Sequence, residues 1–540
     1  MNKRSGRMRV GVLAASAMIL SAAVGSAALA QPRSLVDLQL LSVSDWHAQL
    51  DPLSGVGGAA VLSAYWNADR AANPNTLTFT AGDAFGGSPP LSAFFDEEPA
   101  VRAMNLMGFT ADTLGNHNFD RGVGHLQRMV DLAEYDVLAA NLRDPEASLT
   151  GVAPYAVYEV GGVTVGVVGV INPEAPTLVR PGSFGPLTVT DPVPAANQAR
   201  ARAQAQGAEV VIALTHMGVT GSDPATGAAT GPLIDFADEV GGFDVILGDH
   251  TDTQYAGIHN NALVVQNKSK GLTYARTTLS IDPENGRVAQ RSAQFVVPLA
   301  SKVTPDQRVV DLLKPYRDRI TAVYDTPIGV ATAMFPRGGN VERLREVALG
   351  NLVTDAMRNR YGTQLAFVNG GGLRAALPSS YSPKDSSLRR SALGYAAGPP
   401  YDLVLGDVFT VLPFGNAAVT RTVTGAQLHA ALEHSVGALP VANGKFLQVS
   451  GLRFTYDSRL PAGSRVVAVE LEDGTPILRD ASTYTAATTD FLSTGGDGYT
   501  MLANGHGVTR EVVADVVADH IRARETISPL VEGRIRDLAS

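Results

Sequence analysis

The 540-residue chain contains no cysteine, so it forms no disulfide and offers no thiolate for catalysis, zinc binding or an iron–sulfur cluster. Cationic residues are outnumbered, since 43 Lys and Arg face 52 Asp and Glu and leave a formal net charge of −9. Binding to a nucleic-acid polymer needs clustered cations, so we do not expect such a partner. An apolar content of 45% together with 55 glycines is typical of a globular α/β protein with many tight turns.

Long apolar runs are also absent, except near the N-terminus. Four cationic residues within the first nine precede an Ala-, Val- and Leu-rich run that ends in Ala28-Leu29-Ala30. A basic start, an apolar middle and small residues before the cleavage point are typical of a secretory signal peptide, so we predict one over residues 1–30. We favour cleavage over an uncleaved anchor, and we expect a mature protein that is periplasmic or secreted, with no stable membrane insertion.

Strand-like and helical segments alternate up to about residue 300, which predicts a mixed α/β fold. Short apolar runs predict strands over Val36–Ser44, Thr76–Ala81, Asp136–Ala140, Val163–Val170, Val210–Leu214 and Asp244–Leu247. Helices are predicted over Pro99–Met107, Gly122–Leu132 and Pro194–Gln206. A charged amphipathic stretch predicts a linker helix at 304–326. We therefore expect a first domain at 31–303 and a second α/β domain at 327–540.

Five separated segments place Asp, Asn or His at or near the ends of predicted strands. They are Asp45-Trp46-His47, Gly82-Asp83, Gly115-Asn116-His117-Asn118-Phe119-Asp120, His216 and His250-Thr251-Asp252. Each of these residues alone is more often a turn or surface side chain than a ligand. Together they supply carboxylate, amide and imidazole ligands, which suit two divalent cations and a phosphate ester. Asp45 and His47 alternate, so we expect both side chains on one face of a strand end.

In this order, the segments resemble the motifs of calcineurin-like metallophosphoesterases, and 115–120 resembles the matching motif of secreted 5′-nucleotidases. The resemblance implies a sandwich of mixed sheets flanked by helices, with two divalent metal ions. The first metal would be held by Asp45, His47, Asp83 and Asp252. The second would be held by Asp83, Asn116, His216 and His250. His117 would stabilise the transition state or assist the leaving oxygen, and Asp120 would orient it.

Two positions depart from the family pattern. Asn118 stands where relatives commonly carry Glu, at a position that is not a ligand, so we expect little effect. Asp252 stands where many relatives carry His or Gln. An additional carboxylate makes the first metal site harder, which favours Mn²⁺ or Mg²⁺ over Zn²⁺. The identity of the metals stays open among Mn²⁺, Mg²⁺, Zn²⁺ and Co²⁺.

The second half resembles the substrate-binding domain of the same nucleotidases. The resemblance is carried by Arg345-Glu346, Asn369-Gly370-Gly371-Gly372-Leu373-Arg374, Leu412-Pro413-Phe414-Gly415-Asn416, Asp490-Phe491-Leu492 and Gly495-Gly496-Asp497-Gly498-Tyr499. It implies that Phe414 and Phe491 hold the base between their rings. Arg345 and Arg374 would meet phosphate or carboxyl-like oxygens. Asn369 would recognise base or ribose, and Asp497 the ribose hydroxyls.

The resemblance implies release of phosphate from nucleoside 5′-monophosphates by metal-activated water attack, with nucleoside di- and triphosphates or UDP-sugars as further substrates. Closure about the linker would bring the two halves of the site together. A 2′,3′-cyclic nucleotide phosphodiesterase with 3′-nucleotidase activity is an alternative that Asp120 disfavours. A sulfur-compound hydrolase is disfavoured by the two phenylalanines. A periplasmic nucleotide-binding protein without turnover would not need His117. The preferred base and the oligomeric state stay open.

Overall fold

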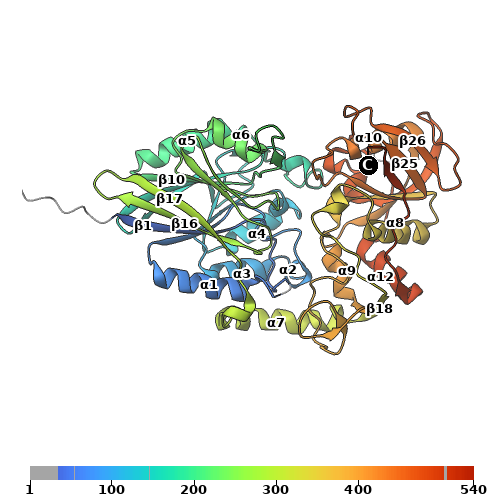
Figure 1. Cartoon of the computed structure of the whole chain (residues 1–540), viewed down its shortest axis with the longest axis horizontal. Helices are drawn as coiled ribbons and strands as arrows, with labels where there is room; N and C mark the ends of the chain where they lie inside the picture. Colours follow the sequence, from blue (N-terminus) through green and yellow to red (C-terminus); the bar gives the residue numbers. More distant parts are fainter. Residues whose placement is uncertain (1–34, 54, 145, 504–506, 540) are drawn as a thin grey trace, which may run out of the picture. The chain divides into compact units, whose positions relative to one another are not determined.

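The computed structural model describes residues 35–539 apart from 54, 145 and 504–506. The predicted signal peptide at 1–30 therefore lies outside the described residues. The described chain is a mixed α/β protein of two domains, in which sheets are flanked by helices (Figure 1). This confirms the predicted fold class, whereas the domain limits at 31–303, 304–326 and 327–540 stay predictions. None of the described helices combines the length and apolarity that a membrane crossing requires.

Two sheets packed face to face build the first half. The seven-stranded sheet has the order β17 (Arg287–Val296), β16 (Tyr274–Asp282), β1 (Val36–Val43), β2 (Thr76–Thr80), β3 (Ala111–Thr113), β4 (Asp136–Leu138) and β6 (Val152–Ala153). The six-stranded sheet has the order β14 (Tyr255–His259), β15 (Ala262–Gln266), β13 (Val245–Gly248), β10 (Val210–Thr215), β8 (Val163–Val170) and β7 (Tyr155–Val160). Leu40 and Phe79 of one sheet share a buried apolar cluster with Val167 and Ile212 of the other.

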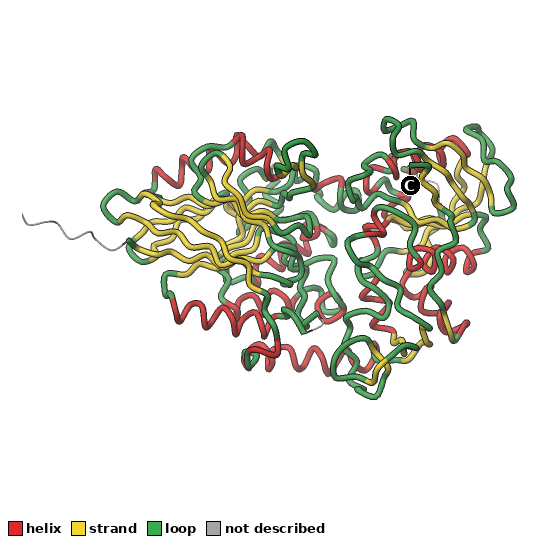
Figure 2. Tube along the Cα trace, in the orientation of Figure 1, coloured by secondary structure: helices red, strands yellow, loops and turns green. Residues whose placement is uncertain are grey.

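Helices cover the outer faces of both sheets (Figure 2). The first sheet is covered by α1 (Ala59–Ala72), α2 (Pro90–Ala93), α3 (Glu98–Met107) and α4 (Val123–Leu132), and the second by α5 (Pro192–Ala205) and α6 (Pro232–Glu239). Pro99 in the first turn of α3 fits because a proline lacks the N–H that would be unsatisfied there. The helix ends at Gly108, whose left-handed φ of 72° suits glycine.

The helix predicted at 304–326 is α7 (Gln307–Tyr324). It begins where the Asp306 side chain accepts a hydrogen bond from the backbone N–H of Arg308. Its buried face, with Leu313 and Ile320, joins the apolar cluster under α1 and α3. The helix is therefore docked on the first half along its length.

The described residues of the second half form three further sheets of three or more strands. The five-stranded sheet has the order β24 (Leu447–Ser450), β19 (Leu365–Asn369), β27 (Thr483–Thr489), β23 (Ala417–Thr424) and β28 (Val508–Val512). One three-stranded sheet has the order β22 (Tyr401–Val404), β18 (Pro327–Ala331) and β29 (Thr526–Ile527). The other has the order β26 (Val466–Leu471), β25 (Leu452–Tyr456) and β30 (Ile535–Asp537). They are accompanied by α8 (Ala348–Tyr361), α9 (Leu405–Val411), α10 (Gly425–Val436), α11 (Asp490–Ser493) and α12 (Val513–Arg524). Three two-stranded ladders complete the fold: β5 (Leu142–Arg143) with β9 (Thr188–Val189), β11 (Gly221–Ser222) with β12 (Ala229–Thr230), and β20 (Arg389–Arg390) with β21 (Ala396–Ala397).

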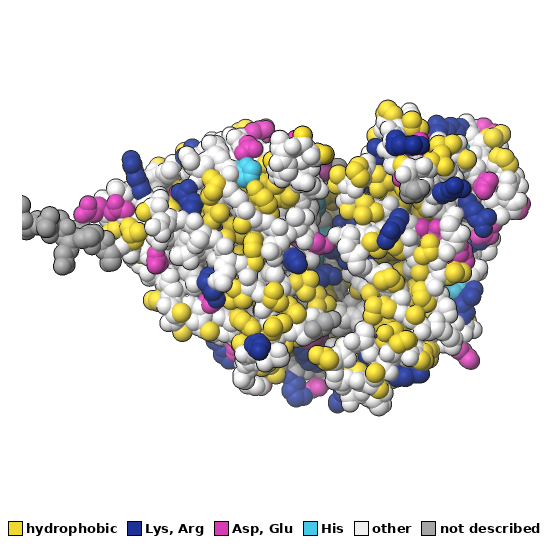
Figure 3. Space-filling view, viewed as in Figure 1, with side chains coloured by type: hydrophobic (Ala, Val, Ile, Leu, Met, Phe, Trp, Pro, Cys, Tyr) yellow, Lys and Arg dark blue, Asp and Glu magenta, His cyan; other side chains and the backbone are white. Residues whose placement is uncertain are grey.

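Charged side chains of both signs are interspersed over the face drawn in Figure 3, with apolar side chains between them. On that face the cations do not form a continuous stripe of the kind that tracks a phosphate backbone.

Candidate metal centre

The loops after five strands bring the predicted metal ligands together. β1, β2 and β3 run parallel in one sheet, and β10 and β13 run parallel in the other. Parallel strands present their carboxyl ends at the same edge, so the loops that follow them meet there. Three groups of described residues have ligand atoms within 4.8 Å of one another: Asp83, His216, His250; Asp45, His47, Asp83; and Asp45, His216, Asp249.

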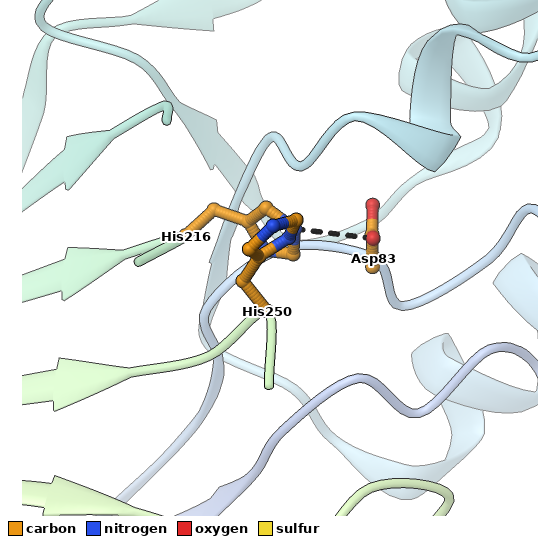
Figure 4. Close-up of side chains that lie close together, drawn as sticks. All are labelled: Asp83, His216 and His250. Atoms are coloured by element: carbon orange, nitrogen blue, oxygen red, sulfur yellow. Dashed lines mark hydrogen bonds and ion pairs between the residues drawn. The ribbon is translucent and has the colours of Figure 1, made fainter. Parts of the chain in front are cut away.

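The first group closes around the Nε2 atom of His216 (Figure 4). Nδ1 of the same ring lies 3.1 Å from the carbonyl oxygen of Ala81, which can only accept, so Nδ1 carries the proton and Nε2 a lone pair. That lone pair faces Asp83 Oδ2 at 3.1 Å, Asn116 Oδ1 at 3.2 Å and His250 Nδ1 at 3.1 Å. The Asp83 and Asn116 oxygens repel that lone pair unless a positive charge lies among them.

The pKa values of His216 and Asp83 also indicate that this group favours a bound positive charge. Burial alone would lower the pKa of His216, but the Asp83 carboxylate raises it to about 9. Burial would raise the pKa of Asp83, but His216 and His117 hold it far below its usual range. Burial lowers the pKa of His250 to about 3. The centre therefore attracts a cation, and a proton on His216 is the substitute when only protein groups are present.

The second group places His47 beside two carboxylates. His47 Nδ1 lies 2.8 Å from the Gly86 carbonyl oxygen, so Nε2 carries the lone pair. Nη2 of Arg374 donates to that Nε2 at 3.0 Å. A guanidinium from the second half of the chain thus lies along the direction in which His47 would bind a metal. Burial, with Arg374 as the next cause, holds the pKa of His47 well below its usual value, so the imidazole is neutral.

The residues present fit divalent cations. Oδ2 of Asp45 and Oδ2 of Asp249 are buried without a hydrogen-bond partner among the described residues. Burial raises the pKa of Asp45 to about 6. Buried carboxylates and imidazoles without thiolate form a donor set for Mn²⁺, Mg²⁺, Co²⁺ or Zn²⁺.

Asp249 was missed by the sequence reasoning. It directly precedes the predicted ligand His250 at the end of β13, and that adjacency was the available signal. Asp252 belongs to none of the three groups formed by the described residues. Its Oδ2 accepts a hydrogen bond from Asn340 Nδ2 at 2.9 Å, in the second half. Its role as a ligand of the first metal stays a prediction.

Strand alternation does not position Asp45 and His47, because β1 already ends at Val43. Both residues instead have left-handed backbones, with φ of 41° and 48°, and Asp83 and His250 have φ of 46° and 74°. Such conformations are unfavourable for residues with side chains and persist where the surroundings enforce them, often at functional sites. No glycine marks these positions, so the sequence pattern could not reveal them.

Two glycines let the loops approach closely. A Cβ on Gly115 would lie 2.2 Å from Asp83 Oδ1. Gly82 has a left-handed φ of 99°, and its Cβ would lie 2.6 Å from His216 Nδ1. Neither position leaves room for a larger side chain beside the metal-ligand groups.

His117 lies at the edge of the two groups in a short 3-10 helix, η1 (His117–Phe119). Its Nδ1 is 3.0 Å from Asp120 Oδ2, and its backbone N–H donates to Asp83 Oδ1 at 2.8 Å. Burial favours the neutral ring, but the Asp120 and Asp83 carboxylates raise the pKa of His117. The His117 ring stacks on Phe414 of the second half, with centroids 5.3 Å apart and planes 14° apart.

Some of the predicted substrate residues lie close to the metal-ligand groups or contact one another, whereas others do not. Arg374 is buried against His47, and its guanidinium carbon lies 5.8 Å from the centroid of the Phe414 ring. A small cavity is lined by Asn369 and Phe414 among others. Asn369 Nδ2 donates to Asp497 Oδ2 at 2.7 Å, and Asp497 has a left-handed φ of 53°.

Two predicted substrate residues stand apart from these contacts. Phe491 is half-buried and packs against Gly496 of η6 (Gly496–Gly498). Arg345 is exposed. The roles predicted for these side chains stay predictions.

Three cations near Arg374 were not predicted: Lys270, Arg337 and Arg343. Lys270 Nζ donates to the carbonyl oxygen of Arg374 at 3.0 Å. Burial, followed by Arg337 and Arg374, lowers the pKa of Lys270 to about 7. Glu342 pairs with Arg337 at 3.0 Å and lies 3.7 Å from Arg343. These cations come from separate segments, so only the folded chain shows that they converge beside the metal-ligand groups.

Comparison with known proteins supports the two-domain fold described above. Residues 327–504 match the family described as 5′-nucleotidase, C-terminal domain. A solved structure of a 5′-nucleotidase precursor from Thermus thermophilus has a TM-score of 0.81 and 29% identity to this chain. The match covers 93% of this chain and 100% of that one.

Curated relatives match over nearly the whole chain. A snake venom 5′-nucleotidase of Gloydius brevicauda is 28% identical over 564 residues, which cover 94% of this chain and 90% of the relative. Endonuclease YhcR of Bacillus subtilis (strain 168) is 28% identical over 534 residues, which cover 94% of this chain. The chain spans only 41% of the length of that endonuclease.

Proposed function

We propose that this chain, which belongs to the family that joins a metallophosphoesterase domain to a 5′-nucleotidase C-terminal domain, hydrolyses nucleoside 5′-monophosphates to nucleoside and phosphate with two divalent metal ions. One observation carries the proposal. Asp83, Asn116 and His250, from three separate loops, each place an oxygen or nitrogen atom within hydrogen-bond distance of Nε2 of His216, which comes from a fourth loop. Such a convergence is unfavourable without cations and suits them well.

Asp45, His47 and Asp83 would hold one ion, with Asp252 or Asp249 beside them. Asp83, Asn116, His216 and His250 would hold the other, so Asp83 is shared. When bound, two such ions lower the pKa of water and neutralise phosphoryl oxygens. The backbone carbonyls of Ala81 and Gly86 fix the tautomers of His216 and His47, which directs their lone pairs into the centre.

His117 would hold a proton at Nε2 for the phosphoryl or leaving oxygen, because its Nδ1 is bonded to Asp120. Asp120 touches the imidazole and acts as a positioning residue. Arg374 would move from His47 to the phosphate oxygens once a metal occupies the lone pair of His47, since a guanidinium binds phosphate with forked hydrogen bonds. Phe414 would offer a ring face to the base.

Export by the predicted signal peptide, to the periplasm or the medium, belongs to the same proposal, as does cleavage of di- and triphosphates or UDP-sugars.

A panel of AMP, 3′-AMP, 2′,3′-cyclic AMP and UDP-glucose tests the substrate class. Turnover with each metal, measured as phosphate released from AMP and 3′-AMP and as nucleoside monophosphate formed from 2′,3′-cyclic AMP and UDP-glucose, should be fastest for AMP. Faster turnover of 3′-AMP and the cyclic nucleotide would replace the proposal with the cyclic phosphodiesterase alternative.

A further inference from the structure

Asp249 carries a carboxylate that the ligand sets predicted from the sequence leave unused. It follows β13 directly and is fully buried, with an exposed fraction of 0%. Its Oδ1 accepts a hydrogen bond from the backbone N–H of His250 at 2.9 Å. Its Oδ2 receives no N–H or O–H among the described residues, and burial together with the neighbouring Asp45 carboxyl raises the pKa of Asp249 well above its usual value. A buried carboxylate oxygen in that state is strongly unfavourable unless a proton or a cation reaches it.

The Asp249 carboxylate lies close to two other groups of the centre. Asp249, Asp45 and His216 each offer a donor atom within 4.8 Å of the others. Asp45 adds a second buried oxygen, Oδ2, that also lacks a partner among the described residues. Nδ1 of His216 is turned to the Ala81 carbonyl oxygen, so this group and the Asp83, His216 and His250 group share the Nε2 side of one imidazole. Two carboxylates, each with one oxygen that lacks a hydrogen-bond partner among the described residues, and one imidazole therefore converge from the loops after β1, β10 and β13.

We propose that Asp249 is a further carboxylate ligand of the metal centre and forms a third ligand group with Asp45 and His216. Together with Asp45 and Asp83, it supplies negative charge that two divalent cations can balance. An added hard oxygen shifts the preference of the centre towards Mn²⁺ or Mg²⁺ and away from Zn²⁺. The inference rests on the proposed function only in that the same loops bind cations.

A purely structural role for Asp249 makes a different prediction. A protonated Asp249 could hold Asp45 in place by a hydrogen bond between the two carboxyl groups. Asn at position 249 has the same shape, keeps an oxygen for the His250 N–H and offers an amide donor to Asp45. Asp249→Asn would therefore preserve a positioning role but remove the anionic ligand.

Asp112 provides a matched control for the loss of a buried carboxylate. It is also buried, with an exposed fraction of 2%, and its Oδ1 accepts a hydrogen bond from the backbone N–H of Gly82 at 3.0 Å. It belongs to none of the three ligand groups of the described residues. Burial raises the pKa of Asp112 to about 7, so Asp112→Asn removes an ionisable carboxyl near the centre while keeping that acceptor.

The test is metal binding to chelator-stripped protein, measured by titration calorimetry with Mn²⁺ and Zn²⁺ and by the electron paramagnetic resonance of bound Mn²⁺. Asp249→Asn should weaken Mn²⁺ binding by about 10- to 100-fold, weaken Zn²⁺ binding less, and change the Mn²⁺ spectrum. Asp112→Asn should keep the affinities and spectrum of the wild type. Wild-type Mn²⁺ binding by Asp249→Asn, or an equal loss in Asp112→Asn, would overturn the inference.

Thermal melts establish that the variants fold. If Asp249→Asn does not fold, Asp249→Ser takes its place with the same expectation for Mn²⁺ and Zn²⁺, because serine removes the charge but keeps an acceptor for the His250 N–H and a donor for Asp45. AMP hydrolysis by the wild type is followed in parallel. Failure to hydrolyse AMP would count against the proposed function alone, because metal affinity is measured without turnover.

Discussion

At the scale of single residues, the contact between Asp120 and His117 should affect the rate of the chemical step without affecting substrate or metal binding. Asp120 belongs to none of the three ligand groups of the described residues but bonds to Nδ1 of His117 at 3.0 Å, so it fixes the direction of Nε2. Asp120→Asn should lower kcat for AMP by about 10-fold or more, part of the roughly 10²–10⁴-fold that a proton-transferring side chain contributes. KM and metal content should stay at wild-type values, because the base clamp and the ligands are untouched.

Steady-state kinetics on AMP and metal analysis of the purified variant test this prediction. Asp131→Asn is a suitable control, since that residue lies in α4 and its carboxylate accepts a hydrogen bond from the Gln127 side chain of the same helix at 2.7 Å. An unchanged kcat in Asp120→Asn would remove Asp120 from the mechanism.

Gly115 tests whether close packing of loops places Asp83. Gly115→Ala would put a Cβ 2.2 Å from Asp83 Oδ1, so the carboxylate must move away from both ligand groups. We expect metal binding to fall at least about 10-fold, as is typical when the support of a ligand is lost. Calorimetric titration with Mn²⁺ measures the change.

Gly124→Ala is the matched control for that variant. Gly124 lies in α4, and a Cβ there would meet no atom within 4 Å. The substitution should raise the free energy of unfolding by about 0.4–1 kcal/mol and leave Mn²⁺ affinity unchanged. Equal affinities in Gly115→Ala and Gly124→Ala would show that Asp83 does not depend on the loop contact.

At the scale of elements, α7 is a docked helix whose buried face belongs to the first half. Leu313 has an exposed fraction of 0%, so Leu313→Ala should lower the free energy of unfolding by about 2–5 kcal/mol through lost burial and a cavity. Val310, on the same helix, is 37% exposed, and Val310→Ala should change it by about 0.5 kcal/mol or less. Urea unfolding followed by circular dichroism compares the two. A small effect of Leu313→Ala would mean that α7 is not docked in solution.

A buried ion pair between Arg390 and Asp407 holds the chain between η5 (Gly370–Gly372) and α9 in place. The Arg390 and Asp407 side chains are 2% and 0% exposed, and Asp407 also accepts from the Ser379 N–H at 2.8 Å. Arg390→Met leaves the Asp407 charge without its partner and should destabilise the protein by about 3–5 kcal/mol.

The exposed pair of Lys314 and Asp318 provides the comparison for Arg390→Met. Their side chains are 68% and 58% exposed, so Lys314→Met should change stability by less than about 1 kcal/mol. Thermal denaturation monitors both variants. Equal shifts of the melting temperature in Arg390→Met and Lys314→Met would contradict the expectation that the buried ion pair matters more for stability than the exposed one.

Elements were largely predictable, because hydrophobic periodicity decides them. The strand predicted at Val163–Val170 is β8, and the helix predicted at Pro99–Met107 is α3 with one residue added. What the pattern could not give are features that arise when loops meet. The left-handed backbones of Asp45 and His47, the orphaned Asp249 and the convergence of Lys270 with Arg374 depend on residues far apart in sequence.

At the scale of the whole molecule, contacts between the two halves complete the candidate site. Arg374 reaches His47, Phe414 stacks on His117, and Asn340 donates to Asp252. The metal-ligand groups come from the first half, whereas the predicted base and ribose contacts come from the second. The proposed reaction therefore requires the full chain.

Phosphate release from AMP by purified protein, stripped of metal and resupplied with Mn²⁺, Mg²⁺, Co²⁺ or Zn²⁺, tests the central claim most directly. We expect turnover that requires added metal and falls by about 10²–10⁴-fold in His117→Ala, while metal content and AMP binding are retained. The absence of turnover with every metal, alongside tight AMP binding, would contradict the account and identify a nucleotide-binding protein instead.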